Sequence, residues 1–461
     1  MASKTTAPAP KTSLRQKDWT KGSVIGNLLL LSWPMVLMEG LWTAGQIVDM
    51  IWIGKLGSDA IAGVGLANII VMMVFSLDMG ILTGVRAMIA RFIGAGNSQE
   101  AACVAGQALI LGACFGTTIT VIGLLLAEKV LGLFGTEPAV VAQGTAYLRV
   151  MLAGWVGMEL LMMSLYAVQA AGDTVTPMII EAGIRVIHVA LCPFLVLGLW
   201  VFPRMGVGGA ALSNVLAQVL GAIAIIWVMF RGRTRIRLIP QDLRINWNII
   251  WRIFKIGLPA VAMNIQGAFG SMLLMRLIIP FGTLALAAHS LAGRVEMFLF
   301  VPGMGLGTGA GVLIGQNLGA GQPARAKKSA WLAVALVEIF MAVCAAVILL
   351  WAESIIGIFS SEAGLISLGA AFLRIAAAGY LISGFAMILQ NCIAGAGDTW
   401  PNMIVSIVTM WAVQLPLAFW LSQHTGLEIY GIRWAMIISA LISTAAYTIY
   451  FFTGRWMKKR L

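Results

Sequence analysis

The sequence predicts an all-α integral membrane protein with about twelve transmembrane helices, arranged as two six-helix bundles related by a pseudo-two-fold axis along the membrane normal. Two observations support this prediction: the chain is too apolar for water, and its two halves repeat each other. Of its 461 residues, 60% are hydrophobic and only 10% are charged, whereas ordinary soluble domains carry about 25% charged residues. A surface of this composition requires lipid as its solvent.

Apolar stretches long enough to cross a bilayer, about 20 residues, recur along the whole chain. Several exceed the hydrocarbon thickness, which predicts tilted helices or helices that extend beyond the membrane. Prolines within these stretches predict kinks. The expected helices lie near residues 25–53, 61–90, 102–126, 144–168, 176–200, 206–230, 250–279, 284–312, 328–351, 368–393, 401–422 and 431–453.

Lysines and arginines in the connecting segments set the expected orientation. With the N-terminus inside, 18 of them fall on the cytoplasmic side and 5, including Lys55 and Arg433, on the outer side. Both termini are therefore expected in the cytoplasm, and the protein is expected in a cell membrane, in particular a bacterial inner membrane. This topology accounts for the net charge of +12. Without a basic stripe interleaved with aromatic residues, that charge does not indicate nucleic-acid binding.

The second half of the chain repeats the first at a constant offset. Pro34 and Pro259 are 225 positions apart (259 − 34), and many further pairs keep this spacing, which composition alone would not produce. Each half holds an even number of expected helices, so the two halves share one orientation. Two such bundles around a central cavity are a known plan of transporters. The paired positions include Gly57 and Gly282, Gly94-Ala95-Gly96 and Gly319-Ala320-Gly321, and Ala171-Gly172-Asp173-Thr174 and Ala396-Gly397-Asp398-Thr399.

The repeat and the charge pattern together predict the organisation of the chain. The expected parts are a cytoplasmic N-terminal tail (1–23), an N-lobe of six helices (24–230), a basic cytoplasmic linker (231–247), a C-lobe of six helices (248–453) and a cytoplasmic C-terminal tail (454–461).

Four motifs, in order along the chain, resemble the multidrug and toxic compound extrusion (MATE) transporters. The resemblance runs from about residue 30 to residue 452, and it implies export of organic, often cationic, compounds driven by inward flow of protons or sodium ions. The motifs are Val48-Asp49-Met50-Ile51-Trp52-Ile53-Gly54-Lys55-Leu56-Gly57, Ile93-Gly94-Ala95-Gly96 with its counterpart Gly315-Gln316-Asn317-Leu318-Gly319-Ala320-Gly321, the repeated Ala171-Gly172-Asp173-Thr174, and Gly206-Val207-Gly208-Gly209-Ala210-Ala211.

Asp49 is the strongest candidate for the cation-coupling site. It lies six residues, or about 9 Å at 1.5 Å per residue, inside the outer boundary that Lys55 marks. Ionisable residues within a membrane are costly and usually functional. Burial favours the neutral carboxyl, which would let Asp49 bind and release a proton near neutral pH. The resemblance also places Asp49 at the acid of the family's N-lobe cation site. The alternative is a structural carboxylate that caps a helix or pairs with an arginine.

Glu181, Arg185 and His188 share one face of the fifth expected helix. The first two are expected to form an ion pair, and His188 is a candidate second proton carrier or, alternatively, a core histidine. The MATE family often has Asn at the position of His188 and Asp at that of Cys192. Hard cations need oxygen ligands, so these differences favour protons over sodium. Asn214 matches a polar position of the same family site, with an interhelical hydrogen bond as its alternative role.

Other polar residues within the expected helices are candidates for the substrate cavity, because buried acids attract cationic compounds. For Glu39, Asp78 and Glu159 the alternatives are burial in a salt bridge and a misplaced helix boundary. Asp173 and Asp398 precede helices and are expected to cap them. The cavity candidates are Glu39, Asp78, Glu159, Glu181 and Arg185 in the first half, and His289 and Glu296, seven positions apart on one helix face, in the second.

The expected function is secondary active export of organic, cationic or amphipathic compounds by proton-coupled antiport with alternating access. Sodium-coupled antiport and a lipid-linked oligosaccharide flippase are alternatives, although a cavity for anionic headgroups should hold several arginines. The chain has no Walker A, HExxH or G-x-S-x-G motif, so enzymatic activity is not expected. No cofactor or metal is expected either, since the five cysteines form no CxxC pair. The expected partners are small organic molecules and membrane lipid, with the protein as a monomer.

Overall fold

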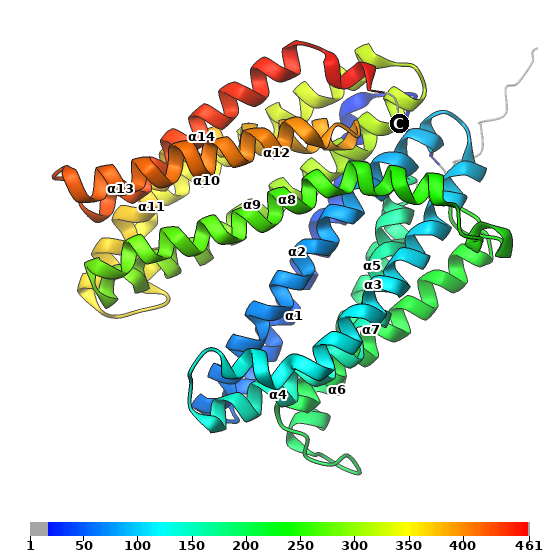
Figure 1. The fold of residues 1–461 in the computed structure, drawn as a ribbon. Coiled ribbons are helices and arrows are strands. Elements are labelled where there is room, and N and C mark those ends of the chain that lie inside the picture. Colours follow the sequence, from blue (N-terminus) through cyan, green and yellow to red (C-terminus); the bar gives the residue numbers. More distant parts are fainter. Residues whose placement is uncertain (1–16, 460–461) are drawn as a thin grey trace, which may run out of the picture.

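The fold was derived from a computed structural model, which describes residues 17–459; residues 1–16 and 460–461 of the expected tails lie outside the described part. The described chain is helical almost throughout (Figure 1). Its helices are α1 (Val24–Gly54), α2 (Ser58–Gly94), α3 (Ser98–Gly132), α4 (Pro138–Ala153), α5 (Trp155–Ala170), α6 (Val175–Leu197), α7 (Val207–Phe230), η2 (Pro240–Leu243), α8 (Trp247–Ile278), η3 (Ile279–Phe281), α9 (Thr283–Gly319), α10 (Pro323–Gly357), α11 (Ala363–Gly395), α12 (Thr399–Ile407), η4 (Val408–Gln414), α13 (Leu415–His424), α14 (Ile429–Phe452) and η5 (Arg455–Lys458).

The number of membrane-spanning helices agrees with the sequence. Within residues 17–459, 11 helices are long and apolar enough to cross a membrane, and the bent pair α4–α5 brings the number to 12. Several helices are longer than expected, and α2 and α9 reach 37 residues each. Helices of this length, about 55 Å at 1.5 Å per residue, extend past a hydrocarbon core of about 30 Å.

The expectation of one helix over residues 144–168 is wrong, because the chain bends by 52° between α4 and α5. The bend falls at Gly154, where α7 packs so closely that an added Cβ would lie 2.1 Å from Val215 Cγ1. Thr120 Oγ1 of α3 donates a hydrogen bond of 2.7 Å to the carbonyl of Leu152 beside the bend. Lipid offers no hydrogen-bond donor, so this bond gives the Leu152 carbonyl a partner that the membrane could not supply.

The helix expected over residues 401–422 is also interrupted, because the π-helical turn η4 separates α12 from α13. Pro416 follows this turn directly and has no amide hydrogen for a regular helical bond. Ser439 Oγ of α14 donates to the carbonyl of Thr409 within the turn, at 3.0 Å. A neighbouring helix therefore stabilises the irregular backbone.

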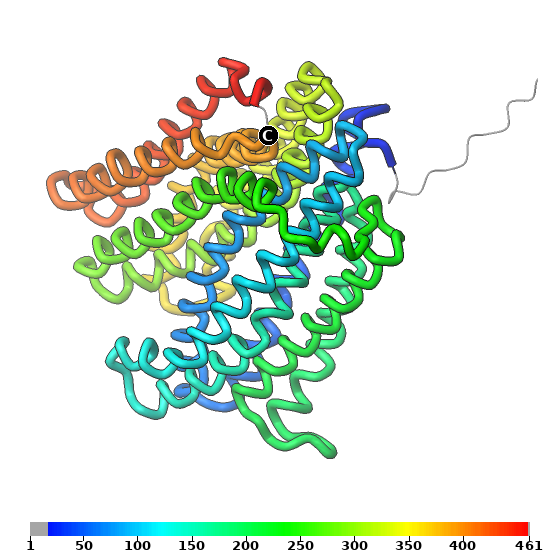
Figure 2. The backbone as a smooth tube through the Cα atoms, turned by 45° about the vertical axis from the view of Figure 1, so that its right-hand side comes forward, coloured from blue at the N-terminus to red at the C-terminus, as the bar shows by residue number. Residues whose placement is uncertain are grey.

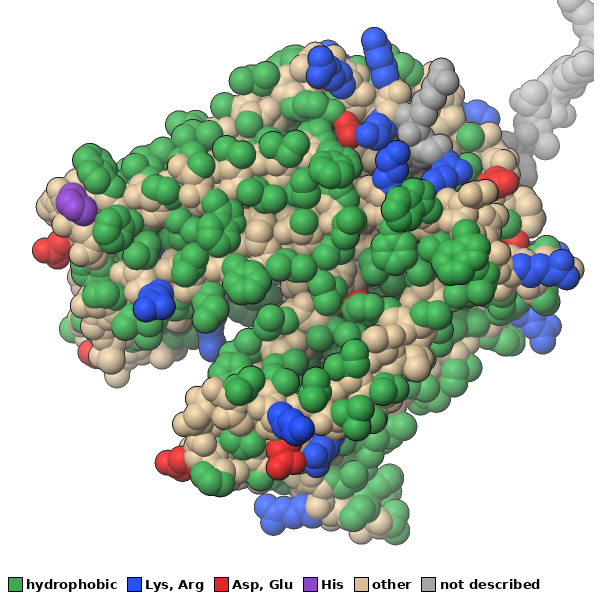
Figure 3. Space-filling model, viewed as in Figure 1, with side chains coloured by type: hydrophobic (Ala, Val, Ile, Leu, Met, Phe, Trp, Pro, Cys, Tyr) green, Lys and Arg blue, Asp and Glu red, His purple; other side chains and the backbone are tan. Residues whose placement is uncertain are grey.

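The helices form two groups that meet at the end carrying both termini of the described chain and diverge toward the other end (Figures 1 and 2). Helices α1–α7 form one group and α8–α14 the other. The surface is hollowed between them (Figure 3). The first helix of each group crosses over at the joined end: α1 residues Leu28 and Leu31 pack in the core of the second group, and Ile253 of α8 packs in the core of the first.

Glycines on α2 and α9 bring the two groups into contact at the joined end. A Cβ added at Gly84 would lie 2.5 Å from the carbonyl oxygen of Ile253, and one at Gly305 would lie 2.7 Å from the backbone nitrogen of Val36. Only glycine permits such an approach. The contacts repeat at the offset of the sequence repeat, because 84 and 309, 80 and 305, and 36 and 261 all differ by 225. We call this contact the inner gate: Gly80, Gly84, Gly305 and Gly309 with the facing residues Ser32, Val36, Ile253 and Val261.

Hydrogen bonds from two residues paired by the repeat, Arg91 and Gln316, join the two groups next to the inner gate. Arg91 Nη2 of α2 donates to the carbonyl of Ala396 in the second group, at 3.0 Å. Gln316 Nε2 of α9 donates to the carbonyl of Ala170 in the first, also at 3.0 Å. These bonds lie beside the repeated Gly-Ala-Gly and Ala-Gly-Asp-Thr motifs and hold the closed end together. The buried Trp19 adds a bond of 2.9 Å from Nε1 to the carbonyl of Gly172.

The two repeated aspartates differ in role. Asp173 Oδ1 accepts a hydrogen bond of 3.0 Å from the backbone nitrogen of Thr176, as expected of a capping residue. The same expectation is wrong for Asp398, which accepts no capping bond from α12. Instead, its carboxylate lies 3.1 Å from Lys459 Nζ and accepts a hydrogen bond from the Tyr450 hydroxyl. Both partners lie near the C-terminal end of the described chain, and only the packing of the folded protein brings them beside Asp398.

Candidate functional site

A cavity of about 420 Å³ opens between the two helix groups, lined mainly by α1, α2, α4, α5, α6 and α7, with α9 on the far side. Its wall is rich in flexible thioethers and aromatic rings, which suit ligands of varied shape. Trp42 and Phe75 stack at a centroid distance of 5.8 Å on one side. The methionines of the wall are Met50, Met72, Met151, Met158, Met162 and Met297.

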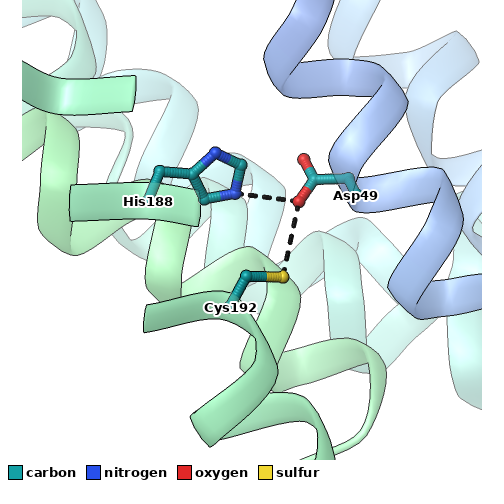
Figure 4. A group of neighbouring side chains, drawn as sticks. All are labelled: Asp49, His188 and Cys192. Atoms are coloured by element: carbon teal, nitrogen blue, oxygen red, sulfur yellow. Dashed lines mark hydrogen bonds and ion pairs between the residues drawn. The ribbon is translucent and has the colours of Figure 1, made fainter. Parts of the chain in front are cut away.

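The cavity wall includes Asp49, and His188 lies beside it (Figure 4). Asp49 Oδ1 of α1 is 2.8 Å from His188 Nε2 of α6, so the two groups share one hydrogen. Cys192, one turn further along α6, places its Sγ 3.8 Å from the same oxygen. His188 is fully buried and Asp49 is 9% exposed. The structure thus brings together Asp49 and His188, two of the residues that were predicted from the sequence to take part in cation coupling.

A close contact between α1 and α6 positions this pair. Gly45 lies one turn before Asp49, and a Cβ there would be 2.7 Å from Arg185 Nη1. The missing side chain lets the Arg185–His188–Cys192 face of α6 lie against α1. Arg185 is held in turn by Glu181, with Nη2 at 2.7 Å and Nε at 2.8 Å from Oε1. The expected Glu181–Arg185 ion pair is therefore present, and it is buried.

The donor atoms around Asp49 bear on which cation could bind there. One carboxylate oxygen, the imidazole nitrogen and the thiol sulfur lie within 4.8 Å of one another. A hard cation such as sodium takes oxygen ligands, and only one of these three atoms is oxygen. Asn214 also lines the cavity, but its Oδ1 accepts a hydrogen bond from Gln218. The arrangement can hold a proton between a carboxylate and an imidazole.

The first-half cavity candidates separate into two groups. Asp78 of α2 and Glu159 of α5 both line the cavity and lie beside each other. Glu39 is not part of the lining and lies instead near Arg86 of α2, whose guanidinium is 5.6 Å from the ring of Tyr166. Glu39 therefore does not line this cavity, and among residues 17–459 it forms no salt bridge either.

Of the second-half candidates, Glu296 but not His289 lines a separate cavity of about 320 Å³. Glu296 lines it and pairs with Arg433, whose Nη1 is 2.8 Å from Oε1. Arg433, which falls within the helix expected over residues 431–453, lies in α14 and is 3% exposed. Its guanidinium also donates to the carbonyl of His289, at 3.3 Å. The ion pair with Glu296 offsets the cost of burying Arg433. The hydrogen bond from Arg433 reaches the backbone carbonyl of His289, so the imidazole takes no part in it.

Sequence reasoning missed several polar residues. Arg86 and Glu338 lie outside the linings of the two cavities, but both are charged residues within expected membrane helices, and that signal alone could have identified them. Tyr147, Trp155 and Gln218 line the main cavity. Nothing in the sequence separates these three from ordinary core residues, since only the packing of α4, α5 and α7 brings them to one wall.

Comparison with known proteins gives the family. The family model described as MatE matches residues 34–194 and 259–420, which is most of the chain and includes both halves of the repeat. This chain belongs to the MatE family. Members of the family are transporters and not enzymes, and this chain is a multi-span membrane protein of the multidrug-efflux type.

Several relatives align with this chain over nearly its full length. It is 26% identical over 448 residues to the "Probable multidrug resistance protein YoeA" of Bacillus subtilis, covering 96% of each chain. It is 24% identical over 422 residues to the FAD transporter of Shewanella oneidensis, covering 91% of this chain and 92% of the relative. A solved MATE transporter in an outward-facing conformation superposes with a TM-score of 0.89 at 23% identity, covering 96% and 98% of the two chains. That likeness establishes the fold.

Proposed function

We propose that this MATE transporter exports organic cations in exchange for protons, with Asp49 and His188 as the proton-binding pair. The observation that carries the proposal is the 2.8 Å contact between Asp49 Oδ1 and His188 Nε2 at the wall of the main cavity. A carboxylate beside an imidazole accepts a proton without rearranging several ligands. Because Asp49 lines the cavity, its proton has a path to water when the cavity is open.

The coupling step follows from the change in charge. A proton that binds Asp49 from the outer side neutralises the carboxylate and weakens its attraction to an organic cation in the same cavity. Because Asp49 is on α1 and His188 is on α6, the new charge state also changes the contact between these helices. A ligand shifts a conformational equilibrium only through its different affinity for the two states. The proton would favour the state that returns inward after the cation has left.

The charges of the cavity favour a cationic substrate. Three acids line the wall, Asp49, Asp78 and Glu159, against the two arginines Arg185 and Arg294. Arg185 is already paired with Glu181. A flippase for anionic lipid-linked sugars, or a transporter of an anion such as the FAD named for the Shewanella oneidensis relative, would need an excess of unpaired arginines instead.

The proposal is tested with purified protein in vesicles loaded with a fluorescent organic cation. A pH gradient alone, without sodium, should drive transport of the cation, and a sodium gradient at equal pH should not. Transport that requires sodium and ignores the pH gradient would refute proton coupling. Empty vesicles and a dissipating proton carrier serve as controls for passive movement.

A second expected result concerns the coupling ion. The double substitution His188→Asn, Cys192→Asp restores the residues that MATE transporters often have at these positions and adds oxygen ligands near Asp49 Oδ1. We expect this variant to lose dependence on the pH gradient and to gain stimulation by sodium. The single change Cys192→Ser adds one weak oxygen ligand and should leave proton coupling in place. A double variant that still responds only to pH would show that other residues select the ion.

The orientation in a cell membrane is a further proposal with its own test. Lysines and arginines gather at the joined end, among them Arg91, Arg235 and Arg325, and the positive-inside rule places that end in the cytoplasm. The cavity would then open outward, at the hollowed end of the surface (Figure 3). We expect tags on both termini to be reachable only from the cytoplasm and a tag between residues 55 and 59 only from outside. An outer C-terminus would contradict this topology.

A further inference from the structure

A second pair of buried acids lies at the wall of the main cavity, away from the Asp49–His188 contact. Asp78 of α2 is 3% exposed and Glu159 of α5 is 2% exposed, and their carboxyl groups are neighbours. The two carboxyl groups lie within hydrogen-bonding reach of each other, and Trp155 lies within reach of Glu159. Helix α3 packs against Glu159 at Gly116, where an added Cβ would lie 3.3 Å from Glu159 Cγ.

Trp155 places a donor at the same site. Its indole is 2% exposed, lines the cavity and lies within hydrogen-bonding reach of Glu159. An N–H donor that faces a carboxyl group stabilises the charged form of that group. The site can therefore accommodate a carboxyl group that becomes charged during the cycle.

No counter-ion is bound to the pair. Among residues 17–459, no ion pair joins Asp78 or Glu159 to a lysine, arginine or histidine. The other charged groups of the wall are Asp49 from α1, Arg185 from α6, which is paired with Glu181, and Arg294 from α9. Asn264 of α8 donates to the carbonyl of Ser76, near Asp78. The neutral polar groups of the wall are Thr43, Gln46, Asn68, Tyr147, Asn214 and Gln218.

We propose that Asp78 and Glu159 form a second proton-binding site, which exchanges its proton for the positive charge of the substrate. Two neighbouring carboxylates in a site of low dielectric constant cannot both be charged, so the pair holds at least one proton when the cavity is empty. A bound organic cation stabilises the negative form, and one proton leaves to the cytoplasm. After the cation departs on the outer side, the pair takes up one proton from outside.

The proposal rests on the proposed function and adds the number of protons per cycle. One proton at Asp49 and one at the Asp78–Glu159 pair make two protons in for each monovalent cation out, which moves one net positive charge inward. Transport of such a cation by the unmodified protein is then driven by an inside-negative membrane potential as well as by pH. Removal of one proton site makes the exchange electrically neutral.

The test uses a permanently charged cation, tetraphenylphosphonium, and the variant Glu159→Gln, which mimics a carboxyl that cannot release its proton. In vesicles with clamped potential and a fixed pH gradient, the unmodified protein should respond to voltage and the variant should not. The exposed Glu128→Gln, which lies outside the cavity and pairs with Arg149, is the matched control and should respond like the unmodified protein. Equal voltage dependence in Glu159→Gln and the unmodified protein would overturn the proposal.

A binding measurement keeps the proposal testable if the variant does not transport. In weakly buffered detergent solution, binding of tetraphenylphosphonium should release more protons from the unmodified protein than from Glu159→Gln. Equal release from both would reject the second site even when Asp49 remains coupled. If instead the unmodified protein shows no pH-driven transport at all, the proposed function fails, and that outcome is distinct from the loss of the second site.

Discussion

Asp49→Asn is expected to reduce pH-driven export of an organic cation to the background of empty vesicles. The substitution keeps the size of the side chain and its contact with His188 but removes the acid that binds and releases the proton. Because the cavity wall is otherwise unchanged, binding of the cation should weaken only through the loss of one negative charge. The measurement is the initial rate of transport after a pH jump, together with the affinity for the cation at equilibrium.

The control for Asp49→Asn is Asp59→Asn, at the exposed start of α2 and outside the cavity. It should transport at the rate of the unmodified protein. A circular dichroism melting curve establishes that the Asp49→Asn protein is folded. Normal gradient-driven transport by folded Asp49→Asn would remove this residue from the mechanism.

Closing the inner gate requires glycine, so Gly84→Ala and Gly305→Ala are expected to prevent the outward-open state. An added methyl group at either position meets backbone atoms, 2.5 Å from the carbonyl oxygen of Ile253 or 2.7 Å from the nitrogen of Val36. Overpacking costs about 1–3 kcal/mol, which shifts a two-state equilibrium by about 5- to 150-fold. We expect transport to fall by a similar factor, with the two lobes shifted toward an inward-open arrangement.

The shift can be measured as a distance between spin labels on Ser58→Cys and Thr283→Cys, the exposed first residues of α2 and α9 at the open end. Cys114, which is exposed, is first replaced by serine. The glycine variants should shorten the distance. Gly65→Ala and Gly293→Ala lie on the same two helices but meet no atom within 4 Å, so they should leave the distance unchanged. An unchanged distance in Gly84→Ala would refute the role of the gate.

The repeat explains why so much of the fold could be predicted from the sequence. A constant offset of 225 positions separates Pro34 from Pro259 and, in the structure, Gly84 from Gly309 in the inner gate. Apolar length then fixes the number of helices, because lipid leaves the backbone no other way to satisfy its hydrogen bonds. Asp49 could be identified for the related reason that a charge within such a helix is costly.

The remaining features depend on contacts between helices that the sequence does not encode locally. The bend at Gly154 follows from the approach of Val215, more than sixty positions away. Asp78 and Glu159 each looked like an isolated acid, and only the packing of α2 on α5 makes them a pair. The sequence likewise gives no sign that Arg433 of α14 pairs with Glu296 of α9, which is 137 positions away.

The central claim is that proton movement and cation movement are obligatorily linked, and it is tested most directly by running the exchange in reverse. Vesicles contain purified protein, a pH-sensitive dye and equal pH on both sides, without sodium. An organic cation is then added to one side only. Because linkage is reciprocal, the cation gradient should drive protons in the opposite direction and change the internal pH, and Asp49→Asn should abolish the change. An internal pH that stays constant while the cation crosses the membrane would contradict the account.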